Sequence, residues 1–289
     1  MLNKIVYRYI DRPRITRWVA EEILDGLSRG LGSIETTLDL GLSREKIVLE
    51  KEGVILRGQL IRYDELRETR YDRVYEVYEN KLNEIVLRDR HIYILKPVSK
   101  EDAPTLEIDG IHMHRIKDVT PWIDSLMKVK VAKVSRGHVV LDTCMGLGYT
   151  AIHSLLRGAR KVYTIEVDEN VIEITMHNPW SRRLGDERVE VIKADATKAI
   201  HYFRDEMFDR IIHDPPRFSS RTGDLYSLEF YRELYRVLKP HGILFHYTGE
   251  PGVHGGPKIV KGVGDRLRKA GFFVKYNNKV KGFIAYKIK

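Results

Sequence analysis

Two kinds of hydrophobic pattern divide the chain near residue 118. From Asp118 to the C-terminus, short apolar runs alternate with amphipathic stretches, which is typical of repeated β-α units around a parallel sheet. The expected strands are HVVLD, KVYTIEV, VEVIKAD, DRIIHD and GILFHYTG. We therefore expect residues 118–289 to form a domain built on an open α/β sheet.

Local signals place the helices and the end of this domain. Thr120 is a candidate N-cap with Pro121 at the first helical position. The glycine turn TCMGLG follows the first strand, and a helix is expected from Tyr149 to about Arg157. Near the C-terminus, two alternating runs flank Asn277-Asn278, which predicts an antiparallel hairpin.

The pattern before residue 118 is different. The run KIVLEKEGVILRGQLI alternates and predicts a β-hairpin that turns at Glu52-Gly53. Helical spacing then predicts a helix with one apolar face, and IVLRDRHIYILKP again predicts a strand. Residues 1–117 are thus expected to form a smaller, β-rich α+β domain. The apolar positions of the expected helix are Leu66, Tyr71, Val74, Tyr75 and Tyr78.

Composition limits the possible functions. Lys and Arg outnumber Asp and Glu by 50 to 41, which suits an anionic partner such as RNA, although a mixed, solvated surface explains the same excess. Cys144 is the sole cysteine, which excludes an intramolecular disulfide and a cysteine-rich zinc site. Early charges argue against a signal peptide and no apolar run is long enough to span a membrane, so we expect a cytoplasmic protein. Gln59 is the sole glutamine beside abundant Lys, Arg and Glu, a bias found in hyperthermophiles.

Acids follow the first three expected strands of the second domain. Asp142, Glu166 and Asp195 end these strands, and the carboxyl ends of parallel strands open onto the ligand crevice. Gly146-x-Gly148-x-x-Ala151 satisfies a loose dinucleotide fingerprint. By itself that pattern also fits a tight strand-to-helix turn that binds nothing. Together with the acids it favours a nucleoside ligand.

These pieces carry a family resemblance. From about Asp118 onwards the sequence resembles class I S-adenosylmethionine-dependent methyltransferases, and most of all predicted archaeal methyltransferases of unassigned substrate. The resemblance implies a Rossmann-like, seven-stranded methyltransferase sheet that ends in an antiparallel hairpin. The matching segments, from motif I to motif V, are VVLDTCMGLGYTA, VYTIEVDENVI, VIKADA, FDRIIHDPPRF and LYRVLKPHGILFHYTG.

The resemblance also implies roles for the residues of the glycine turn and the strand ends. Asp142, Gly146 and Gly148 would hold the methionine part of S-adenosylmethionine. Glu166 would bind the ribose, and Asp195 the adenine amino group. Cys144 departs from the family pattern because it stands where a glycine is usual. We interpret it as a small packing residue on the cofactor loop and not as a nucleophile.

The corner Asp214-Pro215-Pro216 suits an amine nucleophile. Proline fixes φ and has no N–H, so the backbone carbonyls of Asp214 and Pro215 can present acceptors beside the carboxylate and aim a nitrogen lone pair. In amino-methyltransferases an aromatic residue follows this motif, whereas Arg217 and then Phe218 follow it here. Both are candidate substrate contacts, with Arg217 on phosphate or stacked on a base, or simply at the surface. Covalent C5 chemistry on pyrimidines is disfavoured because no cysteine follows Cys144.

Three further features carry weaker signals. His112 and His114 could make half of a metal site, but no third ligand is evident, so we expect no metal. The segment YRYIDRPRITRW mixes arginines with aromatics, as RNA-binding surfaces and core-packed amphipathic helices both do. The glycine-rich segment HYTGEPGVHGGP leads into a helix expected to start at Pro257 and is a candidate mobile substrate loop.

Several functions fit these features. The preferred hypothesis is an S-adenosylmethionine-dependent methyltransferase that acts on an amino group of RNA, with the N-terminal region helping to hold the substrate; a protein side chain is the second target. An aminopropyltransferase of the spermidine synthase type is the alternative enzyme, although TCMGLG and PPRFSS lack the additional acids that hold a polycation. An NAD-dependent oxidoreductase rests on the glycine pattern alone. A non-enzymatic RNA-binding protein with a relic fold would not require all three strand-end acids.

Overall fold

The computed structural model describes residues 2–249 and 256–289, and the chain divides into two compact units. Unit 1 comprises Met1–Tyr7, Ile123–Glu169 and Arg183–Lys289, and unit 2 comprises Arg8–Trp122 and Asn170–Arg182. Each unit has its own cluster of buried apolar residues. Within the described ranges, no helix has both the length and the apolar character needed to cross a membrane.

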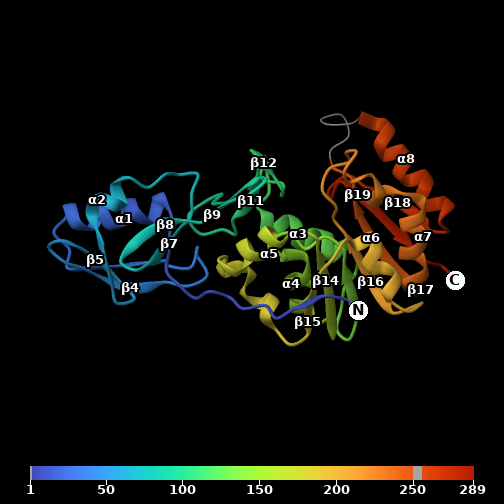
Figure 1. Ribbon diagram of the computed structural model, residues 1–289, viewed down its shortest axis with the longest axis horizontal. Helices are drawn as coiled ribbons and strands as arrows, with labels where there is room; N and C mark the ends of the chain where they lie inside the picture. The colour runs from blue at the N-terminus through green and yellow to red at the C-terminus, as the bar shows by residue number, and fades with distance from the viewer. Residues whose placement is uncertain (1, 250–255) are drawn as a thin grey trace. The chain divides into compact units, whose positions relative to one another are not determined.

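Unit 1 is built on one mixed sheet, which has eight strands in the described residues, in the order β1-β15-β14-β13-β16-β17-β19-β18 (Figure 1). The five central strands are parallel, and the hairpin of β18 and β19 adds β19 antiparallel to β17. The bounds are β1 Lys4–Ile5, β13 Val139–Asp142, β14 Lys161–Glu166, β15 Val189–Lys193, β16 Phe208–His213, β17 Leu238–Tyr247, β18 Phe273–Asn277 and β19 Gly282–Tyr286.

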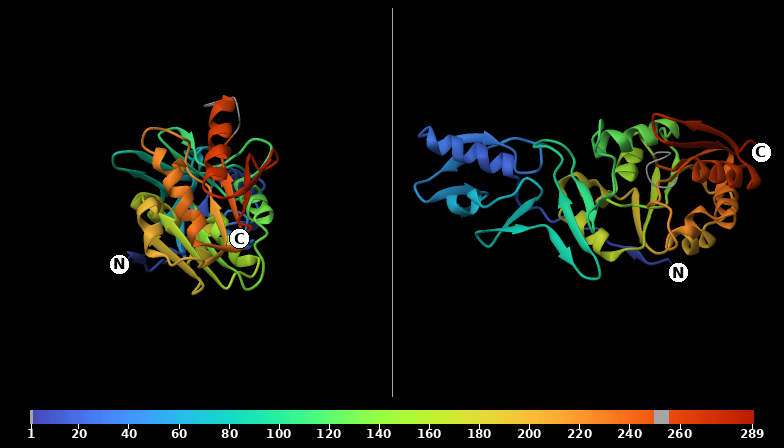
Figure 2. Two further views of the ribbon diagram at one scale, coloured as in Figure 1. Left: turned by 90° about the vertical axis from the view of Figure 1, so that its right-hand side faces the viewer. Right: turned by 90° about the horizontal axis from the view of Figure 1, so that it is seen from above.

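This arrangement confirms the expected Rossmann-like α/β fold with a closing antiparallel hairpin. The strand order reverses between β13 and β16, which is where open α/β sheets bind ligands. One strand was not expected: β1 lies antiparallel to β15, with Lys4 opposite Ile192. This addition shields the exposed edge of the seven-stranded sheet; in the further views of Figure 2 the N-terminal segment runs beside that edge.

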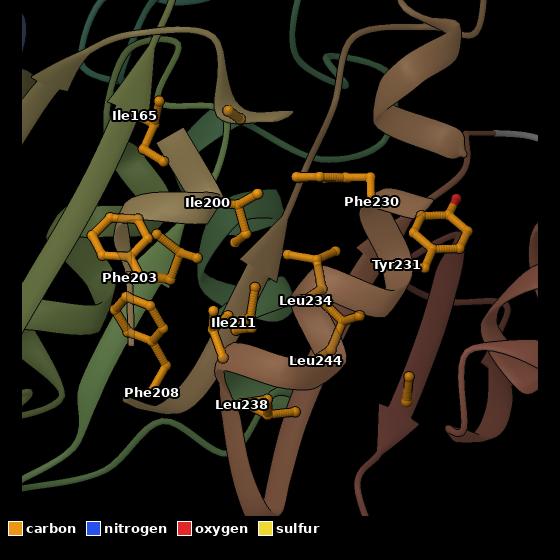
Figure 3. Packing of buried hydrophobic residues seen from close by; sticks show 14 of the residues in the cluster. Ile165, Ile200, Phe203, Phe208, Ile211, Phe230, Tyr231, Leu234, Leu238 and Leu244 are labelled. Atoms are coloured by element: carbon orange, nitrogen blue, oxygen red, sulfur yellow. The ribbon is translucent and has the colours of Figure 1, made fainter. Parts of the chain in front are cut away.

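Helices cover both faces of the sheet because the central strands are apolar on both sides; all four residues of β13 are buried. The helix α4 packs on β13 and β14, while α7 and α8 lie together beside β17 and β18 (Figure 1). Figure 3 shows part of the buried apolar cluster of unit 1, to which Phe203, Phe208, Phe230, Leu234 and Leu244 belong. The helix bounds are α3 Pro121–Val131, α4 Tyr149–Leu156, α5 Glu169–Met176, α6 Ala196–Ala199, α7 Leu228–Val237, α8 Gly256–Lys269, and the short 3₁₀ turns η1 Pro179–Gly185, η2 Ile200–Tyr202 and η3 Gly223–Tyr226.

Unit 2 contains three small antiparallel sheets, in the orders β2-β7-β8, β3-β4-β5-β6 and β12-β11-β10-β9. The helix α1 (Arg17–Ser28) packs on β3 and β4, and α2 (Tyr63–Arg67) packs on α1. The strand bounds are β2 Arg14–Ile15, β3 Ser33–Thr36, β4 Glu45–Leu49, β5 Gly53–Leu56, β6 Gln59–Arg62, β7 Tyr75–Tyr78, β8 Lys81–Glu84, β9 Val86–Arg88, β10 Ile92–Lys96, β11 Thr105–Ile108 and β12 Ile111–His112.

The helix expected around Leu66 to Tyr78 is wrong. The chain is helical only to Arg67, and Tyr75–Tyr78 pairs with Lys81–Glu84 as a hairpin. Glu79 and Asn80 both have positive φ values, 53° and 55°, as a two-residue hairpin turn of matching twist requires. Tyr and Val favour strands, so this turn decided the local structure against the helical spacing. The expected hairpin after Lys46 exists, but its turn covers residues 50–52 and a second hairpin follows at Arg57-Gly58.

Candidate functional site

The glycine turn joins β13 to α4 at the strand-order reversal. Gly146 and Gly148 both adopt the left-handed conformation, with φ values of 52° and 77°. A Cβ atom on Gly148 would lie 2.7 Å from the side chain of Leu184, whereas a Cβ atom on Gly146 would enter open space. Gly148 is therefore required for packing, and Gly146 leaves the backbone accessible to a ligand.

Asp142, the first of the three strand-end acids, is fully buried at the end of β13. Its Oδ1 accepts a hydrogen bond from the Thr150 hydroxyl (3.1 Å), and its Oδ2 accepts one from the Thr164 hydroxyl (2.7 Å). Burial raises the pKa of Asp142 to about 7, even though both hydroxyl donors favour the ionised form. The side chain thus ties the end of β13 to α4 and β14, and both of its oxygens are occupied.

Glu166, at the end of β14, reaches across to the glycine turn. Its Oε2 accepts a hydrogen bond from the backbone N–H of Gly146 (3.0 Å), and its Oε1 accepts from the N–H groups of Val167 and Asp168 (3.0 and 3.1 Å). Desolvation raises the pKa of Glu166 to about 7. The residue as a whole is partly exposed, while three backbone N–H groups already bind its two carboxylate oxygens.

Asp195 lies at the N-cap of α6, directly after β15. Its Oδ1 accepts hydrogen bonds from the backbone N–H of Thr197 (2.9 Å) and from the Thr197 hydroxyl (2.7 Å). The neighbouring strands β13, β14 and β15 are parallel, so Asp142, Glu166 and Asp195 come together at the carboxyl ends of these strands, which form one edge of the sheet.

Cys144 sits among the acids of this edge. Burial, together with the nearby charges of Glu166, Asp142 and Asp214, raises the pKa of the thiol well above its ordinary value. The group therefore stays protonated and is a poor nucleophile. This environment supports the interpretation of Cys144 as a small packing residue.

The Asp-Pro-Pro corner follows β16 directly. Pro215 is buried and Pro216 is exposed, and the Pro216 carbonyl accepts a hydrogen bond from the Tyr226 hydroxyl (2.8 Å). Phe218 is half-exposed and packs edge-on against the Tyr226 ring at 5.4 Å between centroids. Arg217 is exposed beside it. The corner thus presents a carboxylate, an aromatic ring and a guanidinium on one short segment.

Two residues of α3 complete this corner, and the sequence analysis missed both. The ammonium of Lys128 donates a hydrogen bond to Oδ2 of Asp214 (2.6 Å) and lies 2.8 Å from Oδ2 of Asp124. It also sits 4.2 Å from the centroid of the Tyr247 ring. Lys128 is 2% exposed and Asp124 is 0% exposed. The i, i+4 spacing of Asp124 and Lys128 was the one available signal, but it does not reveal a partner 86 residues away.

His213 is neutral and fully used in packing. Its Nε2–H donates to the carbonyl of Leu225 (3.0 Å), so its Nδ1 accepts from the hydroxyl of Thr143 (2.6 Å). Its ring packs edge-on against His246 at 4.4 Å between centroids. Burial lowers the pKa of His213 to about 3. It is thus unsuited to act as a general base.

The remaining sequence candidates lie elsewhere. His112 contacts Glu107 (2.8 Å) and His114 contacts Thr105 (3.1 Å), and the described residues contain no cluster of three or more metal-ligating side chains. In YRYIDRPRITRW, Arg14 is fully buried and donates to backbone carbonyls of unit 2, so at least this arginine is structural. Residues 250–255 of the proposed substrate loop lie outside the described residues.

The chain is similar in sequence to a protein family and to several known proteins. The family model "Conserved hypothetical protein 95" matches residues 122–246. The "Uncharacterized protein MJ1233" of Methanocaldococcus jannaschii is 43% identical over 282 residues, which cover 94% of this chain and 95% of that protein. A probable ribosomal RNA small subunit methyltransferase A of Pyrococcus abyssi is 33% identical over 168 residues, which cover 57% of this chain and 55% of the relative.

A solved structure shows the same fold. Spermidine synthase from Thermotoga maritima aligns with a TM-score of 0.54 and 20% identity over 74% of each chain. These comparisons and the strand order support membership of the class I methyltransferase superfamily. Methyltransferases of this superfamily use S-adenosylmethionine, which is the expected cofactor. Within the superfamily, the chain belongs to the family of the Methanocaldococcus jannaschii protein.

Proposed function

We propose that this protein is an S-adenosylmethionine-dependent methyltransferase that modifies an amino group on RNA. The observation that carries the proposal is one sheet edge on which an open glycine turn, a ribose-type acceptor and an Asp-Pro-Pro corner meet. Gly146 provides close backbone approach, Glu166 is linked to it by a hydrogen bond, and Asp214 follows the adjacent central strand.

The residues present fit the cofactor. We propose that Glu166 accepts hydrogen bonds from the ribose hydroxyls, that Asp195 receives the adenine amino group, and that Gly146 and Gly148 hold the methionine part. In this proposal Asp142 acts by holding the turn in place, since both of its oxygens are already bound by threonine hydroxyls. Cys144 supplies only a small side chain at the position where the family usually has glycine.

The chemistry is an in-line displacement, in which the protein mainly has to align the nucleophile. When bound, S-adenosylmethionine supplies an electrophilic methyl group on a sulfonium. The chain's own contribution is the corner at Asp214 and Pro215, whose carboxylate and carbonyls accept the two hydrogens of an amino group and direct the nitrogen lone pair. Phe218 offers a face for a base, and Arg217 a cation for phosphate.

RNA is the proposed substrate for two reasons. The chain carries a formal net charge of +9, which favours association with a polyanion. The Pyrococcus abyssi relative is named for ribosomal RNA methylation. A protein side chain is the second target, and the domain of residues 1–117 is proposed to help hold the substrate.

A second candidate function is aminopropyl transfer, because the spermidine synthase structure shares the fold over 74% of the chain.

Calorimetric titration separates the two candidate functions. We expect S-adenosylmethionine to bind more tightly than decarboxylated S-adenosylmethionine or NAD, and Glu166→Ala to abolish most of that binding. A preference for the decarboxylated form would favour polyamine synthesis, and binding of NAD alone would contradict the reading of the glycine turn.

A further inference from the structure

The buried lysine beside Asp214 is the feature that the proposed function leaves unexplained. A methyltransferase corner that only presents a carboxylate to an amine has no need of an internal cation. Yet Lys128 is 2% exposed and lies within 3 Å of two carboxylates, Asp214 at 2.6 Å and Asp124 at 2.8 Å. Removing three charged groups from water carries a desolvation cost that their mutual attraction offsets only in part. We therefore expect the ion pairs of Lys128 to have a role in the function of this corner.

The electrostatics fix the state of this lysine. Burial by itself would lower the pKa of Lys128, but the charges of Asp214 and Asp124 outweigh it, so the pKa is raised above its ordinary value. The face of the Tyr247 ring adds a further attraction for a cation. Lys128 is therefore an ammonium at every pH at which the protein would be assayed, and it cannot serve as a base.

Asp214 is affected in the opposite direction. Burial raises the pKa of Asp214 above the usual range of an aspartate, and the ammonium of Lys128 limits that rise. The hydrogen bond from Lys128 also fixes Oδ2 of Asp214. The titratable groups around this carboxylate are Lys128 and Asp124 of α3, Asp142 of β13, Cys144 of the glycine turn, Tyr226 of η3 and Tyr247 of β17.

The histidines closest to the corner cannot take up a proton either. His213 is held by Thr143 and Leu225, as described above. His246 donates through Nδ1 to the carbonyl of Tyr247 (2.8 Å) and accepts at Nε2 from the Tyr231 hydroxyl (2.6 Å). Burial lowers the pKa of both imidazoles. Neither Lys128 nor these two histidines can therefore act as a general base for a protonated amine, and both oxygens of Asp142 are already bound by threonine hydroxyls.

We propose that Lys128 is a positioning residue that holds Asp214 through Oδ2 and opposes its protonation, and that the corner consequently accepts a neutral planar amino group and rejects protonated aliphatic amines. The inference rests on the proposed function and narrows its substrate to a nucleobase amine. A nucleobase nitrogen attacks without prior deprotonation: the N–C bond forms, the C–S bond breaks with its electron pair left on sulfur, and the extra proton leaves the methylated nitrogen to water. A lysine side chain or a polyamine must lose a proton first.

The first test reads the charge state of Asp214 without any turnover. In protein labelled with ¹³C at the aspartate carboxyl carbon, the Asp214 resonance is assigned by its loss in Asp214→Asn and is then followed by pH titration. We expect Lys128→Met to raise the titration midpoint by about one unit or more. The control Asp124→Asn removes the other carboxylate, keeps the Lys128–Asp214 pair, and should leave the midpoint unchanged or lower it.

An unchanged midpoint in Lys128→Met would overturn the proposal. If that variant is too unstable, Lys128→Met/Asp124→Asn removes the cation with less residual charge and gives the same readout. Because this measurement needs neither cofactor nor substrate, it stands even if calorimetry shows that S-adenosylmethionine does not bind, which would refute the proposed function alone.

The second test compares acceptors. Wild-type protein is incubated at neutral pH with S-adenosylmethionine carrying a radiolabelled methyl group and equal amounts of unmodified transcribed RNA, poly-lysine or spermidine. Label on an exocyclic base nitrogen of the RNA, with little on either aliphatic amine, is the expected result. Efficient transfer to poly-lysine or spermidine at neutral pH would overturn the proposed selectivity.

Discussion

Replacing Lys128 by Met provides the sharpest test of the internal ion pair. The substitution keeps an unbranched apolar stem one atom shorter than lysine but leaves two carboxylates without their cation, Asp124 fully buried and Asp214 with an 18% exposed side chain. Removing one partner of a buried pair typically costs about 3–5 kcal/mol. For a protein of this size that loss corresponds to a decrease in melting temperature of roughly 10 °C. The effect should be smaller near pH 5, where the remaining carboxylates can take up protons.

Urea unfolding followed by circular dichroism at pH 8 and pH 5 measures this loss. Lys130→Met is a matched control, because Lys130 lies on the same helix but is exposed, and it should change stability by less than about 0.5 kcal/mol. The triple variant Lys128→Met/Asp124→Asn/Asp214→Asn removes the stranded charges and should recover much of the loss. If Lys128→Met costs no more than Lys130→Met, the buried ion pair does not exist in solution and the reasoning above fails.

Three further predictions concern other parts of the structure. The folded-state pKa of Asp142 is raised to about 7 from 3.8, so its contribution to stability is present below pH 4 and is lost as the pH rises to about 7. The stability of Asp142→Asn relative to wild type should therefore increase by roughly 2–3 kcal/mol between pH 5 and pH 8. A pH-independent difference in urea unfolding would contradict this. Gly148→Ala should cost about 2 kcal/mol or more because of its left-handed φ and the contact with Leu184, whereas Gly146→Ala should cost only about 1 kcal/mol but weaken S-adenosylmethionine binding in calorimetry; equal stability losses would argue against the different surroundings of the two glycines. Arg14→Met should destabilise unit 2 by roughly 3 kcal/mol, because three carbonyls lose their donor, and a loss below about 1 kcal/mol in thermal unfolding would show that these bonds are not retained.

The sequence predicted the α/β fold of residues 118–289 well because its signals are local and mutually consistent. Continuous apolar runs predict buried parallel strands, and each ends at an acid or a glycine turn, so the strands β13 to β17 and the final hairpin are found where they were expected. The edge strand β1 was missed because two residues pairing with β15 leave no periodicity to detect.

The N-terminal region was harder to predict because its residues suit two structures. The tyrosines and Val74 around residues 71–78 satisfy helical spacing, yet they are also good strand formers. Glu79 and Asn80 decide the outcome through their positive φ values, and nothing in the residue types except Asn80 announces that turn. Long-range pairing with Arg14 and Ile15 in β2 then stabilises the strand.

The candidate site shows the same division. Glycines and strand-end acids were readable from spacing alone. The partners that set their behaviour were not, since Thr164 reaches Asp142 from the adjacent strand and Lys128 reaches Asp214 from a helix far earlier in the chain. Sequence reasoning therefore identified which carboxylates gather at the sheet edge but not which of them are already occupied.

Transfer of a labelled methyl group to RNA tests the central claim most directly. Purified protein with radiolabelled S-adenosylmethionine and unmodified transcribed ribosomal and transfer RNA should place label on an exocyclic base nitrogen, identified by nuclease digestion and chromatography. Asp214→Asn should lower the rate by about 100-fold or more, while binding S-adenosylmethionine as the wild type does. Label on no RNA but on a polyamine or a protein, or full activity in Asp214→Asn, would contradict the account.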